Sequence, residues 1–493
     1  MEQMNKNRTI LETAALFVVV VVICGCRHPM ADYEAKLTAG DYPGAASIAT
    51  EEIKDGDCDE LMWRLMAGSA SRLAGESASA IAQFDRAEDV MIDHDGTSVF
   101  TKGATTTWAM MTNDKSFPYD GGGQDRIMTC LYKAIDFAAD GKPDAARTEL
   151  NRAAQHQENW LFERRKEIAD AKERLDKDAE AYKKEKQSDN AAAAKSSNID
   201  SGAVVDGAFA NADFAAQVKA QSGFDMATDG VLDNLQPVDW MNPYVSHVTG
   251  VFRWLNGDEA RNYLKDAASC DANNAVLKRD FAECDQGAKP QNQVWVWVEE
   301  GLGPRREEWR IDLPLILIPY VNRFVMYAGM ASPKLVNRAS AGENWQVKSS
   351  AGEIPMTETV DMDAKMKLEF DVYFRGALIR EITRTTVKIG TQVALGVVAE
   401  NVNDSYTQIA LKGGQVAAAA WAASTTGADT RSWTALPKKV HGIRLDRPAD
   451  GKIQIANGYG NVAEITVPQG NSMVFVSKPS IQATASVKCV TYP

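Results

Sequence analysis

The spacing of apolar residues changes near Gln293, and this change constrains the fold more than any other feature of the sequence. Before Gln293, small and apolar residues recur at helical spacing between glycine-containing turns. After it, the alternating run 294–298 is typical of a buried strand. From Met362 to Ile382 an apolar side chain stands at every fourth position, which predicts a helix over 362–398. The sequence therefore predicts an α+β protein, with a helical region first and then a β-rich domain that contains one long helix.

Four segments of the helical region share one local pattern. Each has a glycine that ends a helix, a charged residue in the turn and an alanine-rich start to the next helix. Gly40 and Gly75 lie 35 residues apart, and Gly75 and Gly141 lie 66 apart, while a fourth copy surrounds Gly257. These distances are close to one and two periods of about 34 residues, the period of tetratricopeptide repeats. We therefore expect tetratricopeptide-like helical hairpins.

The chain is too long for one hydrophobic core. Single cores stop growing near roughly 250–300 residues, and this chain has 493. We expect five segments: a signal peptide over 1–25, tetratricopeptide-like hairpins over 26–157, a charged helix and linker over 158–201, a second tetratricopeptide-like region over 202–288, and the C-terminal α+β domain over 293–493.

An uncharged stretch of 14 residues, 13–26, ends in Ile23-Cys-Gly-Cys26. It is shorter than the roughly 20 residues that span a bilayer, but it has the length of a signal-peptide core. A branched apolar residue three positions before a cysteine, with small residues between, is the pattern of bacterial lipoprotein signal peptides. In such proteins signal peptidase II cuts before the cysteine, which carries the lipid. We predict lipidation at Cys26 and a periplasm-facing protein; Arg27, where inner-membrane retention would need aspartate, favours the outer membrane. A plain secretory signal and an uncleaved anchor are the alternatives.

Composition narrows the classes of function. There are 54 Lys and Arg against 67 Asp and Glu, a net charge of −13, which argues against nucleic-acid binding. The five histidines are scattered without metal-ligand spacing, so we expect no metal and no cofactor. Cys270 and Cys284 are the one pair that we consider for a disulfide in an oxidising compartment, and buried free thiols are the alternative.

A cationic ridge is predicted on the long helix, because Arg380, Arg384 and Lys388 are spaced by four. The ridge, together with Asp429, Arg431 and Trp433, has two interpretations. In one, the cations bind an anionic ligand or partner and Trp433 stacks beside it. In the other, carboxylates neutralise the cations, because several unpaired buried cations would be prohibitive. We expect Asp429 to pair with at least one ridge cation and to hold segment 428–437 against the helix.

The sequence resembles a family of uncharacterised bacterial tetratricopeptide-containing lipoproteins. The resemblance rests on these elements, in chain order: Asn113-Asp, Leu131-Tyr-Lys-Ala with Ala145-Ala-Arg-Thr-Glu, Asn242-Pro-Tyr, Glu299-Glu-Gly-Leu-Gly-Pro-Arg, Arg380-x-x-x-Arg384-x-x-x-Lys388 and Ala428-Asp-x-Arg-Ser-Trp-x-x-Leu-Pro. The last element is the most specific. The resemblance implies an envelope location and partners among envelope proteins, including other lipoproteins of a channel or cell-wall assembly, but it implies no reaction.

Two classes of function remain. The first is a non-catalytic protein-interaction scaffold, because helical repeats offer concave surfaces for peptides. The second is an envelope glycan-binding module or glycan-acting enzyme that uses the C-terminal domain. The aromatic pairs Trp295/Trp297 and Trp240/Tyr244 are the candidate sugar platforms, although alternating strand tryptophans are more often core. We find no Gly-x-Ser-x-Gly nucleophile motif and no Ser-x-x-Lys in a suitable context, and we expect no catalysis.

The lipid anchor is directly testable. Cells expressing the full chain and fed alkyne-palmitate should label the protein, and Cys26→Ala should abolish the label, since only the thiol at the cleavage site receives the lipid. Label that persists in Cys26→Ala would contradict the prediction.

Overall fold

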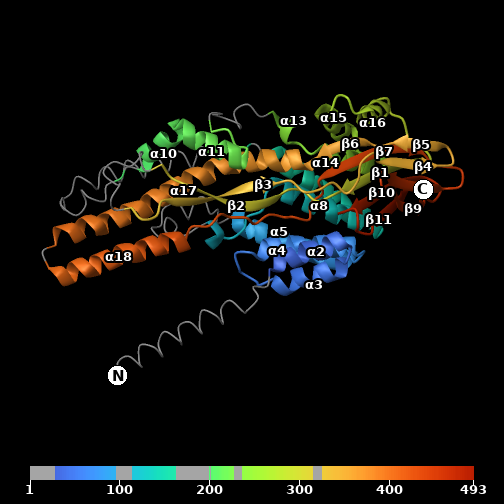
Figure 1. Ribbon diagram of the computed structural model, residues 1–493. Coiled ribbons are helices and arrows are strands. Elements are labelled where there is room, and N and C mark those ends of the chain that lie inside the picture. The colour runs from blue at the N-terminus through green and yellow to red at the C-terminus, as the bar shows by residue number, and fades with distance from the viewer. Residues whose placement is uncertain are drawn as a thin grey trace, which may run out of the picture.

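The computed structural model describes residues 28–95, 114–160, 162, 199, 201–226, 236–314, 325–402 and 404–492. Figure 1 shows a body in which helices pack beside strands, and an arm of two helices that extends from it. The chain is a mixed α+β protein, as predicted, with helices first and strands later. The predicted signal peptide with Cys26, and almost all of the predicted charged helix and linker, lie outside the described residues.

The N-terminal half is built from short helices that end where the glycine pattern predicts. Gly40, Gly75, Gly141 and Gly257 all have φ between +72 and +82°, the left-handed conformation that ends a helix. The segment after Asn242 forms three helices, and the Asn242 side chain caps the first by accepting from the Tyr244 N–H. The elements are α2 (Pro29–Ala39), α3 (Tyr42–Glu52), α4 (Glu60–Leu73), α5 (Ser77–Asp95), η1 (Asp114–Ser116), α8 (Gly123–Ala139), a helix over 143–160, α13 (Pro237–Trp240), α14 (Pro243–Leu255), α15 (Arg261–Cys270) and α16 (Ala275–Asp285).

The strands form two packed sheets and a separate hairpin. The first sheet has the order β11-β10-β1-β7-β6, the second the order β5-β4-β8-β9, and β2 pairs with β3. Within the first sheet, β1 runs parallel to β10 and antiparallel to β7. The strands are β1 (Gln293–Glu300), β2 (Arg305–Asp312), β3 (Gly329–Val336), β4 (Gln346–Ser349), β5 (Gly352–Pro355), β6 (Thr357–Asp361), β7 (Lys439–Asp446), β8 (Lys452–Asn457), β9 (Gly460–Thr466), β10 (Asn471–Lys478) and β11 (Ser486–Tyr492).

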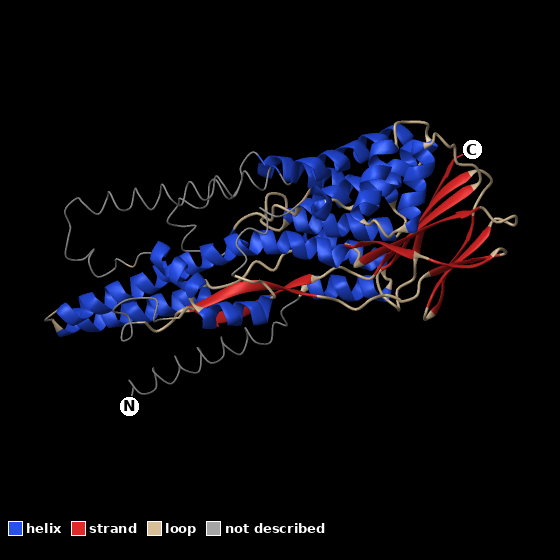
Figure 2. Cartoon of the chain, turned by 90° about the horizontal axis from the view of Figure 1, so that it is seen from above, coloured by secondary structure: helices blue, strands red, loops and turns tan. Residues whose placement is uncertain are grey.

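The first sheet is buried on both faces, which the alternation in β1 explains. Val294, Val296 and Val298 pack in the core shared with the second sheet. Trp295 and Trp297 point the other way, into the core built by the helices. Figure 2 shows the strands lying against the helical body. One hydrophobic core therefore crosses the boundary predicted between 288 and 293.

The long helix is α17 (Met362–Asn401), as predicted, but it is followed by a second helix, α18 (Ser405–Ser424), that packs along it. The expectation of one long helix was therefore wrong. The sequence of α18 does not show the pattern of an amphipathic helix. It has one charged residue, Lys412, and its buried face consists of Gln415, Ala419 and Ala422. Such a face gives no apolar stripe. Together, α17 and α18 form the arm seen at the left of Figure 1.

Two helices of the predicted second repeat region do not join the other short helices. α10 (Ser201–Ala210) and α11 (Ala212–Ser222) pack on α17 and on the β2–β3 hairpin. Phe214 lies in a separate core with Phe370, Phe374 and Leu378 of α17. This small core supports the base of the arm.

The triple glycine 121–123 begins α8, and its N-terminus binds a carboxylate of the protein itself. Glu369 of α17 accepts hydrogen bonds from the backbone N–H of Gly123 and, at 3.4 Å, of Gln124. A carboxylate is favourable there because helix N-terminal N–H groups lack partners and carry partial positive charge. A Cβ on Gly123 would lie 2.2 Å from Cδ1 of Trp160, so the stacked pair Trp160/Trp240 leaves no room for a side chain.

Gly123→Ala should therefore destabilise the protein by about 1–3 kcal/mol, the usual cost of overpacking a core. The measurement is urea denaturation followed by tryptophan fluorescence. Gly414→Ala is the matched helical control, because a Cβ there meets nothing within 4 Å; it should leave stability unchanged or raise it. Equal stability of Gly123→Ala and the native chain would contradict the packing described.

Candidate functional site

The cations of the predicted ridge meet a carboxylate, but it is Asp114 and not Asp429. Asp114 lies 3.1 Å from Nη2 of Arg380 and 2.6 Å from Nη2 of Arg384. The hydroxyl of Tyr373 is 3.4 Å from the same carboxylate. Burial alone would raise the pKa of Asp114, but the two guanidinium groups outweigh it and hold the pKa well below its usual range.

Asp429 binds the arginine two residues away. Nε and Nη2 of Arg431 donate to the two oxygens of Asp429 at 2.8 and 2.9 Å, a bidentate pair. Arg431 also donates to the carbonyls of Cys58 and Asp114 and to the carboxylate of Asp59. The expected pairing of Asp429 with the ridge was wrong, because the guanidinium of Arg431, two residues away, binds both of its oxygens. The ridge and segment 428–437 still meet at Asp114. Its carboxylate pairs with the two ridge arginines, and its backbone carbonyl accepts from Arg431.

Lys388 stands apart from the two arginines. Its ammonium lies 3.4 Å from Oγ1 of Thr426 and 5.8 Å from the ring centroid of Trp421. Burial lowers its pKa. Lys388 therefore contacts α18 and the turn after it, and it helps to hold the two helices of the arm together.

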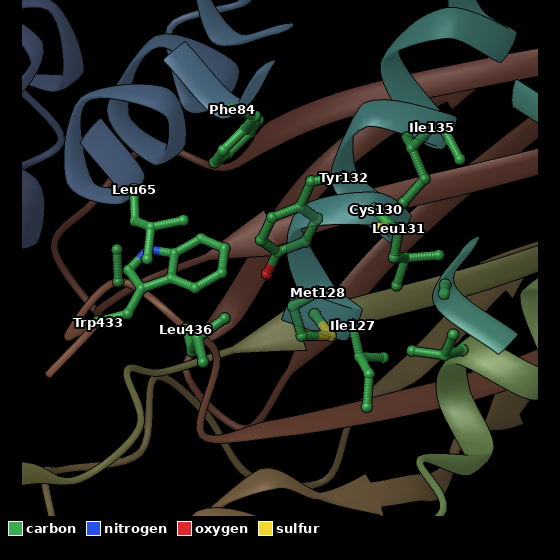
Figure 3. Close-up of a cluster of buried hydrophobic side chains, with 14 of the residues drawn as sticks. Leu65, Phe84, Ile127, Met128, Cys130, Leu131, Tyr132, Ile135, Trp433 and Leu436 are labelled. Atoms are coloured by element: carbon green, nitrogen blue, oxygen red, sulfur yellow. The ribbon is translucent and has the colours of Figure 1, made fainter. Parts of the chain in front are cut away.

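Trp433 is not a stacking platform beside the cations. It is fully buried among the N-terminal helices, where its indole N–H donates to Oγ of Ser69 at 2.8 Å. The rings of Phe84 and Tyr132 lie 5.9 and 5.8 Å from it, at tilted and edge-on angles (Figure 3). The tryptophan of the most specific sequence element is thus a core residue of the helical region.

Segment 428–437 lies as an extended strap between the helices and the sheets. The Ala428 N–H donates to Glu308 at 2.9 Å, Arg338 donates to the Thr434 carbonyl, and the Gly303 N–H donates to the Leu436 carbonyl at 2.7 Å. The segment is therefore bonded to β2 and to the loops that flank the β2–β3 hairpin.

A buried polar cluster that the sequence analysis missed lies beside this strap. Arg72 donates to Glu299 at 3.0 Å and to Ser477 at 3.3 Å, and Tyr244 and Ser477 also donate to Glu299. Alternation in β1 was the available signal, because it places Glu299 on the same face as the two tryptophans. The adjoining cavity of about 20 Å³ has room for about one water molecule. A larger ligand would have to displace protein atoms.

His247 forms a second buried polar cluster, with its tautomer fixed by its neighbours. The Trp297 indole, which can only donate, lies 3.2 Å from Nδ1, so Nδ1 is the acceptor. Nε2 then carries the hydrogen and donates to Asp280 at 2.8 Å. Asp280 also accepts from Trp295 and Arg444. His247 therefore links α14 and α16 to the first sheet.

The one metal-like group found among the described residues is already neutralised. Glu88, Cys130 and Glu149 converge, but the ammonium of Lys133 lies 2.7 Å from Glu88 and 3.0 Å from Glu149. Arg152 contacts both carboxylates as well. The cations of the chain occupy the position that a metal ion would need.

Cys270 and Cys284 are free thiols, so the considered disulfide is absent. Cys270 ends α15, whereas Cys284 lies nine positions after Ala275, the first residue of α16. The two cysteines therefore lie on different helices, and a disulfide needs Cα atoms within about 7 Å. Burial raises the pKa of Cys270 to about 11, so this thiol is unreactive at neutral pH.

The aromatic pairs considered as sugar platforms are inside the protein. Trp295, Trp297 and Tyr244 are fully buried, and Trp240 is 1% exposed. Their interpretation as core residues is confirmed, and they offer no surface on which a sugar could stack.

Comparison with protein-family models, with curated proteins and with solved structures finds no match to this chain. The resemblance to tetratricopeptide-containing lipoproteins therefore stays a prediction. Within the described part of the chain, no helix is both long enough and apolar enough to cross a bilayer.

Double-mutant cycles should separate the two carboxylates. Asp114→Asn and Arg384→Gln should be coupled by at least about 1 kcal/mol in the free energy of unfolding, because the two groups are in contact. Asp429→Asn and Arg384→Gln should be coupled more weakly, because Asp429 reaches Arg384 through Arg431 and Asp114. Coupling of Arg384 to Asp429, with none to Asp114, would contradict the observed pairing.

The contribution of Asp114 should also depend on pH. Its folded pKa is depressed, so the stability that it adds is present above the unfolded carboxyl pKa of about 3.9 and is lost as the pH falls through the folded value. The stability difference between the native chain and Asp114→Asn should therefore be steady from about pH 7 to about pH 5 and shrink as the pH falls below about 4. A difference that stays constant would contradict the assignment.

Proposed function

We propose that this protein is a lipid-anchored, periplasm-facing scaffold of the bacterial cell envelope, which binds other envelope proteins and catalyses no reaction. The anchor is Cys26 and the membrane is the outer membrane. Its partners are envelope proteins, including other lipoproteins. The helical hairpins are tetratricopeptide-like units that have acquired a sheet and an arm.

The observation that supports this function best is the internal neutralisation of the charged clusters. Asp114 pairs with the ridge, Asp429 with Arg431, Glu299 with Arg72, and Asp280 with Arg444. Groups that already have partners stabilise one arrangement of helices and sheets. A rigid body of this kind suits a protein that holds partners in place.

The strap changes where a partner would bind. Tetratricopeptide-like scaffolds bind peptides on their inner surface, but here Trp433 of the strap packs among α4, α5 and α8. We therefore place partner binding on the outward faces of the helices and on the arm.

The test is co-purification of the full chain from native membranes after cross-linking in cells, with protein identification by mass spectrometry. Specific envelope proteins should be enriched, and Cys26→Ala, which changes the location of the protein, should lose them. Saturable binding of the full chain to isolated peptidoglycan, without recovery of any protein, would overturn the proposal in favour of a glycan-binding module.

A further inference from the structure

The outer face of α18 is apolar and uncovered. Tyr406 is 86% exposed, Ile409 70% and Val416 55%. These side chains follow one another at intervals of three and seven residues, so they share one face of the helix. That face lies opposite the one formed by Gln415, Ala419 and Ala422, which is buried towards α17.

Small residues complete this exposed face, which we call the α18 seam. It consists of Tyr406, Ile409, Ala410, Gly413, Val416, Ala417 and Ala420, all of them exposed. The seam contains no charged residue, and Lys412, the one charge on the helix, lies beside it. The acidity of the chain as a whole therefore does not extend to the seam.

The seam is complementary to itself. If a second α18 lies antiparallel with the two Gly413 residues opposite each other, Tyr406 faces Ala420 of the other copy and Ile409 faces Ala417. Ala410 then faces Val416. Each large side chain meets a small one, which is how two apolar surfaces interdigitate. A two-fold axis produces both halves of this pattern from one sequence.

Gly413 supports the same arrangement. A glycine inside a helix costs about 1 kcal/mol relative to alanine, and a Cβ at Gly413 would meet nothing within 4 Å in the monomer. The packing of a single chain therefore does not require a glycine there. A glycine at the crossing point of two helices lets their backbones approach closely.

We propose that the protein is a homodimer in which α18 packs antiparallel against α18 of a second copy, with the two-fold axis at Gly413. The occupant is another copy because each large residue of the seam has a small residue at the position that a two-fold axis through Gly413 brings opposite it. This inference rests on α18 alone and does not depend on the proposed scaffold function.

The first test uses bulk at the axis, in the full chain solubilised in mild detergent. The native chain should sediment as a dimer, and Gly413→Leu should sediment as a monomer, because the new side chain has space in the monomer and none at the crossing. Gly414→Leu is the matched control: it adds the same side chain one residue away, off the seam, where a Cβ also meets nothing within 4 Å. It should remain dimeric.

The second test is cross-linking in native membranes. Gly413→Cys lies at the axis, so copper-catalysed oxidation should yield a reducible product of twice the chain mass. The native chain and the exposed-site variant Asn262→Cys should yield none. Adding Ile409→Glu to Gly413→Cys should lower the yield at least tenfold, whereas adding Lys412→Glu should preserve it.

A monomeric native chain, or equal cross-linking of Gly413→Cys and Asn262→Cys, would overturn the dimer. Loss of the dimer in Gly414→Leu and Gly413→Leu alike would overturn the seam as its interface. None of these results bears on recovery of envelope partners, which tests the scaffold function separately.

Discussion

The burial of Trp433 between the N-terminal helices is the interaction on which the rest of the structure depends. Its indole bonds to Ser69 and packs against Phe84 and Tyr132, so the strap that carries it is fixed to α4, α5 and α8. At its C-terminal end the strap leads into β7, a neighbour of the central strand β1. Apolar contacts of the strap therefore join the helices to the first sheet. They hold the strap in a single position between the two.

Buried charge then fixes the details of this junction. Arg72 joins α4 to β1 through Glu299, and Arg431 joins the strap to the loop before α4. A buried ion pair adds little net stability, because desolvation offsets most of the attraction, but loss of one member is costly. Such pairs favour one register of helix against sheet. An acidic chain with buried, paired arginines can thus be rigid inside and strongly charged outside.

Local features were predictable from the sequence, and distant pairings were not. The glycine helix stops, the alternating strand β1 and the stripe of α17 depend on neighbours within a few residues. Asp114 and Arg380 are 266 positions apart, and no local pattern connects them. The sequence predicted a pair between the Asp429 carboxylate and the cations of the ridge, because the charges are opposite and both lie in the C-terminal half of the chain. In the structure Asp429 binds Arg431, which is only two residues away. α18 was not predicted, because its alanines and glycines produce no amphipathic pattern. The same small residues form part of the α18 seam.

The position of β1 has a consequence for how the chain matures. This central strand is synthesised well before β7 and β10, the two strands that flank it, and Trp433 bonds to a serine 364 positions earlier. During synthesis from the N-terminus the helices can form early. The apolar surface that Trp433 and the first sheet bury on them stays exposed until the strap and β7 have been synthesised. Contacts of such long range slow folding and leave apolar surface exposed meanwhile. Truncation before β7 would leave the helices without the strands β7 and β10, which flank β1 in the sheet that covers them.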